Sequence, residues 1–153
     1  IGFCLVGSEM CIRDSVDTGM GMERTLAVLN GFTNIYESDL FSNVIKALRD
    51  RVGSTYSERG GRIAADHIRT AVHLLADGVR PGNVDQGYIL RRLIRRSIRE
   101  LHRMGWDRPF VADLAEMFIE KYRDAYPNIE ILHRDILDEL RIEEEAFSKT
   151  LIK

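Results

Sequence analysis

Hydrophobic residues from Met22 onward recur every three or four positions, the spacing that places them on one face of a helix. The segment LFSNVIKALRDRV at residues 40–52 is typical, with its hydrophobic residues on one stripe. Glycines and prolines interrupt this pattern and mark the ends of successive helices. Helices are predicted from Met22, from Ser38 to Gly53, from Gly60-Gly61 to Gly78, over 88–105, from Asp107 to Pro127, and from about Glu130 onward.

The fold class that follows is mainly α, a helical bundle preceded by one short strand. No segment after residue 30 alternates between hydrophobic and polar residues, as a half-buried strand would. The one expected strand lies around Val16–Thr18. Residues 1–15, IGFCLVGSEMCIRDS, have no clean period and resemble a translated sequencing adapter joined to a coding sequence. We therefore treat them as a junction outside the fold, the alternative being a genuine short strand at Phe3–Val6.

The composition is that of a globular domain with a core. The chain has 153 residues, of which 44% are hydrophobic and 30% are charged. No apolar run is long enough to cross a bilayer, so no membrane role is expected. Cys4 and Cys11 match no zinc-binding spacing and the four histidines are scattered, so the sequence predicts no metal site. Without a disulfide framework, a cytoplasmic location is expected.

The net charge of −2 conceals two oppositely charged segments. Residues 86–108 contain seven arginines and two acids, whereas residues 130–147 contain seven acids and two arginines. A basic and an acidic block on one chain indicate two surfaces that have different partners.

The basic segment is an amphipathic helix with an arginine face. At about 100° per residue, leucines and isoleucines cover one arc and arginines the opposite arc. The arginines are Arg91, Arg92, Arg95, Arg96, Arg99 and Arg103. Several are spaced i, i+4, where like charges repel, and arginine pairs well with phosphate through its planar fork. This pattern favours nucleic acid as partner. Pairing with the acidic segment 130–147 and a plain solvated face are the alternatives.

A second candidate site is the segment VDTGMGMER at residues 16–24. It places an acid, two glycines spaced two apart and an arginine at the start of the first helix. Taken alone, this is ordinary turn chemistry before a helix. A short Gly-x-Gly is only a weak signal for a binding pocket, so its interpretation depends on the rest of the chain.

Three stretches, in order, resemble the alanyl-tRNA synthetase family of class II aminoacyl-tRNA synthetases. They are VDTGMGMER, RIAADHIRTAVHLLADGVRPGN and QGYILRRLIRRSIR. The first resembles motif 3 of the catalytic domain, and the others resemble the helical segment that holds the tRNA acceptor stem. The resemblance covers residues 16–151. It implies that residues 16–35 end a class II α+β catalytic domain and that residues 36–153 form a helical tRNA-recognition domain.

The resemblance implies a ligase that activates alanine with ATP to an adenylate and transfers it to tRNA(Ala). Asp17 then holds the amino group of alanine, and Gly19 lies against that substrate. Gly21 lets the chain turn from strand to helix beside the nucleotide, and Arg24 binds the γ-phosphate of ATP. Mg²⁺ ions bridge the phosphates, but we identify no protein ligands for them in this sequence. No residue is assigned as a catalytic acid or base.

The resemblance also assigns residues that bind RNA. Asn83 matches a position near the G·U wobble pair that the family recognises in the acceptor stem, where an exposed guanine amino group can meet an amide. The arginines implied to bind tRNA, mainly at backbone phosphates, are Arg91, Arg92, Arg95, Arg96 and Arg99. The chain departs from the family pattern Pro-Ser-Asn-x-Gly-Arg-Gly-Tyr at Gly82, Asp85 and Gln86.

By the same resemblance, the chain is expected to hold half of an active site and most of an acceptor-stem clamp. Motifs 1 and 2 would precede it, and an editing domain, the only part expected to bind Zn²⁺, would follow. We therefore expect no alanine activation by this chain alone, and pyrophosphate exchange above background would contradict that. Two alternatives stay open: a stand-alone helical RNA-binding module without catalysis, and an all-α interaction scaffold whose basic and acidic helices pair.

Overall fold

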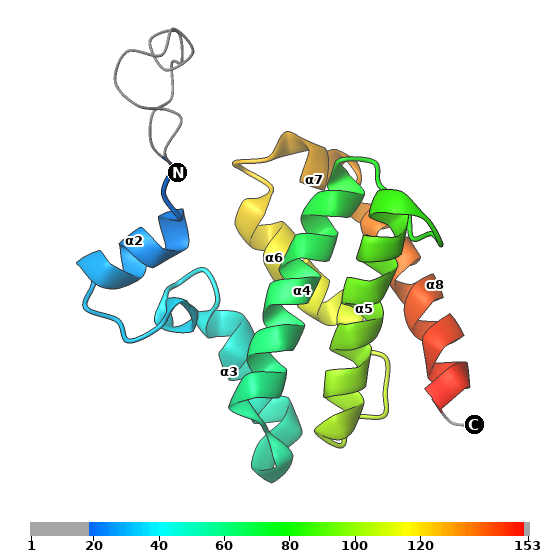
Figure 1. Cartoon of the computed structure of the whole chain (residues 1–153), viewed down its shortest axis with the longest axis horizontal. Coiled ribbons are helices and arrows are strands. Elements are labelled where there is room, and N and C mark those ends of the chain that lie inside the picture. Colours follow the sequence, from blue (N-terminus) through cyan, green and yellow to red (C-terminus); the bar gives the residue numbers. More distant parts are fainter. Residues whose placement is uncertain (1–18, 152–153) are drawn as a thin grey trace, which may run out of the picture. The chain divides into compact units, whose positions relative to one another are not determined.

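The computed structural model describes residues 19–151, which divide into two units, residues 19–38 and residues 39–151 (Figure 1). The elements are α2 (Met22–Leu29), η1 (Ile35–Glu37), α3 (Ser42–Val52), η2 (Gly53–Thr55), α4 (Glu58–Ala76), α5 (Asp85–Arg103), α6 (Val111–Tyr122), α7 (Pro127–Ile131) and α8 (His133–Leu151). The described part of the chain contains no strand, and the predicted mainly-α class is confirmed. The strand expected around Val16–Thr18 and the segment 1–15 lie outside the described residues.

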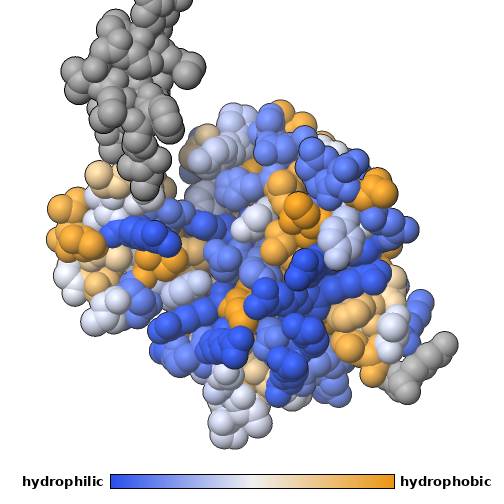
Figure 2. Space-filling view, in the orientation of Figure 1, coloured by the Kyte–Doolittle hydropathy of each residue, from blue (hydrophilic) through white to orange (hydrophobic). Residues whose placement is uncertain are grey.

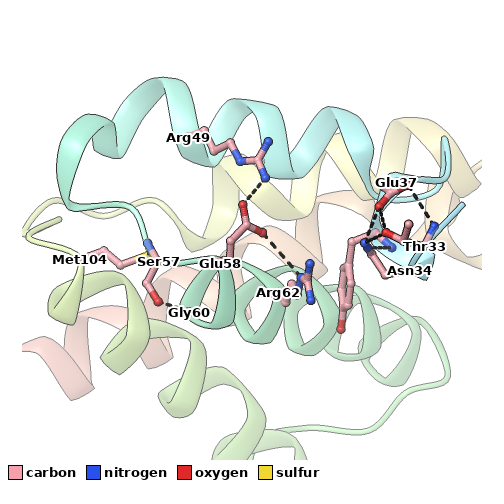
Figure 3. A network of polar contacts seen from close by, with 10 residues as sticks. Thr33, Asn34, Glu37, Arg49, Ser57, Glu58, Gly60, Arg62 and Met104 are labelled. Carbon is pink, nitrogen blue, oxygen red and sulfur yellow. Dashed lines mark hydrogen bonds and ion pairs between the residues drawn. The ribbon is translucent and has the colours of Figure 1, made fainter.

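The first unit consists of α2 and the 3₁₀ helix η1. Helix α2 is preceded by Gly21, whose φ of −71° and ψ of 115° are extended values. The chain therefore enters this helix without the left-handed turn that a glycine would permit. At the other end, the Glu37 carboxylate accepts hydrogen bonds from the Thr33 N–H at 3.2 Å and from Asn34 Nδ2 at 2.6 Å (Figure 3).

In the second unit, α4 and α5 form an antiparallel hairpin (Figure 1). Helix α8 packs against both α5 and α6, while α3 and α6 pack against α4. The acidic C-terminal helix thus lies beside the arginine helix. Among residues 19–151, every helix is too short or too polar to span a lipid bilayer.

The core is built largely from the predicted hydrophobic stripes. Helix α5 buries one face, with Leu90, Ile94, Ile98 and Leu101 at most 2% exposed, while Leu93 is half-buried. Fully buried side chains of the neighbouring helices complete the core: Leu48, Ile68, Val72, Leu75, Leu114, Phe118, Ile136 and Leu140. Because the apolar face of α5 is committed to this core, its arginines are left on the opposite side.

Helix α4 begins earlier than predicted. Gly60-Gly61 does not open it, because Ser57 caps a first turn that starts at Glu58 and accepts a hydrogen bond from the Gly60 N–H at 3.3 Å. Both glycines are buried in the helix. A Cβ on Gly60 would lie 3.1 Å from the Met104 sulfur, so the small residue permits close packing there. Figure 3 shows this cap beside the Glu58 ion pairs to two arginines.

Pro127 also has a different role from the one predicted. Helix α6 already ends at Tyr122, and Pro127 occupies the first position of the short helix α7. Its ring holds φ near the helical value, and its missing N–H has no partner to lose in a first turn.

The connection between α4 and α5 folds back on itself. The Gly82 N–H donates to the Gly87 carbonyl at 2.9 Å. A Cβ on Gly87 would lie only 2.7 Å from the Arg80 carbonyl oxygen, so only glycine fits there. Helix α5 begins at Asp85, three residues before the predicted start at 88. Asp85 has a φ of +48°, a left-handed value that is uncommon for residues other than glycine.

Candidate nucleic-acid interface

A groove of about 410 Å³ runs along the arginine face of α5. Its lining residues are Asn83, Tyr88, Arg91, Arg92, Arg95, Arg96, Arg99 and Phe147. All six residues that the sequence assigned to RNA binding therefore line one cavity, which we call the arginine groove. In Figure 2, strongly hydrophilic side chains gather over the middle of α5.

One column of arginines faces α8 and is neutralised there. Arg91 Nε lies 3.3 Å from Glu143 Oε2, and Arg95 Nε lies 2.6 Å from Glu143 Oε1. The Glu143 side chain is only 7% exposed, so this carboxylate is buried between two guanidinium groups. Pairing with the acidic segment, one of the alternatives raised by the sequence, is present for these two arginines.

A second column faces outward. Arg92 and Arg96 are exposed, and the described residues offer neither of them a hydrogen bond or an ion pair. Arg99 and Arg103 lie 3.7 Å and 3.1 Å from the carboxylate of Glu100 on their own helix. The arginine face is thus divided between arginines that are paired with acids of this chain and an outer column, Arg92 and Arg96, that is open to an external anion.

Asn83 is held in the groove by the first column. Arg91 Nη1 donates to Asn83 Oδ1, and Arg91 Nη2 donates to the Pro81 carbonyl at 3.3 Å. Arg91 therefore spans the loop, the groove and α8. The sequence assigned Arg91 to phosphate, but in the structure its three nitrogens already have partners.

The role of Glu144 was not predicted. Its buried carboxylate accepts hydrogen bonds from the Phe110 N–H at 2.9 Å and the Val111 N–H at 3.2 Å, which caps the start of α6. Burial raises the pKa of Glu144, and the two backbone hydrogen bonds oppose that rise. A signal was present, because Glu144 follows Ile136 and Leu140 at four-residue intervals on a buried stripe.

Two aromatic residues of the groove were also missed. The Tyr88 side chain is about half exposed, and the Arg95 guanidinium lies 5.3 Å from the centre of the Phe147 ring. Aromatic rings beside arginines offer flat surfaces on which a base or ribose can pack.

The second candidate site lies in the first unit. Arg24 is exposed, and the described residues provide it with no hydrogen-bond or ion-pair partner. No described atom comes within 4 Å of a Cβ built on Gly19, and Gly21 provides no side-chain cap for α2. Asp17 lies outside the described residues, so its predicted pairing with these residues stays a prediction. Residues 19–151 contain no group of three or more His, Cys, Asp or Glu side chains that could hold a metal ion.

Comparisons with known proteins match almost the whole chain. The model of the family described as tRNA synthetases class II (A) matches residues 8–153. An alanine–tRNA ligase from Nitrosococcus oceani is 44% identical over 140 residues, and one from Thermobifida fusca is 42% identical over 143 residues. The alignments cover 91% and 90% of this chain.

The chain spans 16% of the length of each of these two curated relatives. The family match begins inside residues 1–15, whose assignment as a junction stays a prediction. The predicted domain boundary at residues 35–36 likewise stays a prediction.

Proposed function

This chain belongs to the tRNA synthetases class II (A), and on that premise we propose that it is part of an alanine–tRNA ligase whose arginine groove binds the acceptor stem of tRNA(Ala). The observation that carries the proposal is that Asn83 and five arginines converge on one groove. Such an enzyme would join alanine to its tRNA at the expense of ATP, in the cytoplasm.

Arg92 and Arg96 support binding to the RNA backbone. Both are exposed, and they lie four residues apart on α5, about 6 Å along the helix axis. A guanidinium without a protein partner can form two parallel hydrogen bonds to a phosphate. These contacts would position the acceptor stem without reading its sequence.

Asn83 is the candidate for sequence recognition. The minor groove of an A-form helix is wide and shallow, so a short side chain on a loop can reach the base edges. A G·U wobble pair exposes the guanine 2-amino group there, and an amide oxygen can accept a hydrogen bond from it. In a G·C pair, one N–H of that amino group donates to the cytosine carbonyl, so only the other N–H stays exposed in the minor groove.

The proposal extends to alanine and ATP in the first unit. By family resemblance, Asp17 would hold the alanine ammonium, with Gly19 against the substrate. The alanine carboxylate would attack the α-phosphorus and pyrophosphate would leave, while Arg24 would neutralise charge on the γ-phosphate. The exposed Arg24 and the uncapped start of α2 after Gly21 are compatible with a phosphate. Mg²⁺ would accompany ATP and offset charge on its phosphates, although residues 19–151 contain no group of three or more His, Cys, Asp or Glu side chains that could hold the ion.

The test is a salt titration of binding between this chain and an RNA hairpin that carries the tRNA(Ala) acceptor stem. If about three phosphates are neutralised, affinity should fall roughly fiftyfold between 50 and 200 mM salt. Absence of salt-sensitive binding would favour the all-α scaffold instead. A stand-alone RNA-binding module predicts the same titration, and the coding sequence upstream of Val16 separates that alternative from a ligase.

A further inference from the structure

We infer that Glu143 is a positioning residue for RNA recognition, which orients Asn83 through Arg91 and makes the arginine groove more selective but less attractive to RNA. The inference rests on the proposed function and assigns a role to a residue that does not line the groove.

The amide of Asn83 is held at its oxygen by Arg91. A guanidinium carries only hydrogen-bond donors, so Arg91 can bond the oxygen of this amide but not its NH₂ group. The contact therefore selects one of the two orientations that the amide could adopt. It leaves the NH₂ group and the second lone pair of Oδ1 for a ligand. An amide held in one orientation loses less rotational freedom when it binds a base edge.

Arg91 is itself held by Glu143 and by the loop backbone. Its Nε lies 3.3 Å from Glu143 Oε2, while Nη2 donates to the Pro81 carbonyl at 3.3 Å. Glu143 also pairs with Arg95, and little water reaches its carboxylate because the side chain is buried. The orientation of Asn83 thus depends on a residue of α8 that follows it by sixty positions in the sequence.

A second anchor fixes the same loop to α8. Arg80 Nε lies 3.4 Å from Glu139 Oε1, one turn before Glu143 on that helix. The loop is therefore attached to α8 directly at Arg80 as well as through Arg91 at Asn83, so losing Glu143 should release the Asn83 side chain without unfolding the loop.

Glu143 also changes the charge balance of the arginine groove. Glu143 offsets positive charge on Arg91 and Arg95, which reduces the attraction of the groove for any polyanion. Removing Glu143 should therefore change two properties in opposite directions: general affinity for RNA should rise, and preference for G·U over another base pair should fall. A residue with only a structural role would weaken both.

The experiment compares binding of the chain to two acceptor-stem hairpins that differ only in carrying G·U or G·C. For Glu143→Ala, we expect the affinity for the G·C hairpin to rise about twofold to fivefold. The slope of log affinity against log salt concentration should become steeper by about 1–2. We expect the preference for G·U to fall about fivefold to tenfold. Glu145→Ala is the matched control, since it removes an exposed acid from the same helix and should leave the preference unchanged.

A second pair of variants works even if Glu143→Ala folds poorly. Arg91→Lys and Arg95→Lys both preserve net charge, and both weaken a contact to Glu143. Only Arg91 also holds Asn83, and a lysine ammonium cannot replace its fork-like set of contacts. We expect Arg91→Lys to lose the G·U preference about fivefold or more, and Arg95→Lys to keep it.

The outcomes separate the two proposals. If the unmodified chain prefers G·U and Asn83→Ala removes that preference, yet Glu143→Ala and Arg91→Lys both retain it, the positioning role is wrong and the proposed function stands. If the unmodified chain shows no salt-sensitive RNA binding or no G·U preference, the proposed function fails and the positioning role fails with it.

Discussion

Helices α5 and α8 carry similar amounts of opposite charge, but the structure uses the two sets differently. On α8, Glu143 holds two arginines and Glu144 caps the start of α6. On α5, Arg92 and Arg96 point away from these acids and have no partner among the described residues. The comparison shows that charge density in a sequence does not tell which charges are structural and which are available to a ligand.

The physical reason is the distance between a charge and the core. Glu143 and Glu144 lie beside the buried stripe of α8, where an ionised carboxylate is unfavourable unless it is paired or hydrogen-bonded. Arg92 and Arg96 lie opposite the buried stripe of α5, where water solvates them. Substitution of the buried Glu144 should therefore change stability, and substitution of the exposed Arg92 and Arg96 should change binding.

The largest expected effect is on RNA binding by the outer column. Replacing both Arg92 and Arg96 by Ala should weaken binding to the acceptor-stem hairpin on the order of 10- to 100-fold, because two charge-assisted contacts to phosphate are lost. The slope of log affinity against log salt concentration should become shallower by about 1.8, or about 0.9 for each lost phosphate contact. Fluorescence anisotropy at several salt concentrations measures both quantities.

The matched control is Arg123→Ala with Arg134→Ala, which removes the same charge from exposed positions outside the groove. This control should retain most of the affinity. Equal losses in the two double variants would show that net charge, rather than the groove, governs binding.

The second-largest expected effect is on stability, through the cap that Glu144 provides. Glu144→Ala leaves the Phe110 and Val111 N–H groups without their carboxylate, which should lower the free energy of unfolding by about 1–3 kcal/mol. Urea denaturation measures this change, with the exposed Glu145→Ala as its control. An unchanged midpoint for Glu144→Ala would contradict the capping role.

The stability of the chain should also depend on pH through Glu144. Burial raises the folded-state pKa of Glu144 above its ordinary value of 4.5, so the folded chain binds this proton more tightly than the unfolded chain. The part of the stability that comes from this tighter proton binding is then full below pH 4.5 and is lost as pH rises through the folded pKa. Glu144→Gln cannot ionise, so its stability relative to the unmodified chain should increase with pH over that window. Parallel stability curves, measured by urea denaturation from pH 4 upward, would rule this out.

The smallest expected effect concerns Asp85, an acid at the start of the basic helix. Asn tolerates the left-handed φ of this position as well as Asp does, so Asp85→Asn removes only a charge. We expect RNA binding to tighten about twofold to threefold, since the charge lies within about a Debye length of the groove. Stability should change by less than about 0.5 kcal/mol. Weaker binding would indicate that the Asp85 carboxylate assists the ligand.

Much of the fold could be predicted because its helices are strongly amphipathic. The face of α5 that buries Leu90, Ile94 and Ile98 is the face expected from the helical period. The errors occurred where a local contact overrides the usual meaning of a residue. Ser57 starts α4 ahead of its two glycines, and Pro127 opens a helix instead of ending one.

The candidate site was predicted as a set of residues, but not as a network. Helical spacing alone is enough to put the arginines of α5 on one face and to leave that face outside the core. It cannot assign their partners, because Glu143 lies 52 positions after Arg91 and 48 after Arg95. Those contacts exist only because α8 packs along α5. Packing in three dimensions therefore selects which arginines are neutralised, which remain open to an anion, and how Asn83 is held.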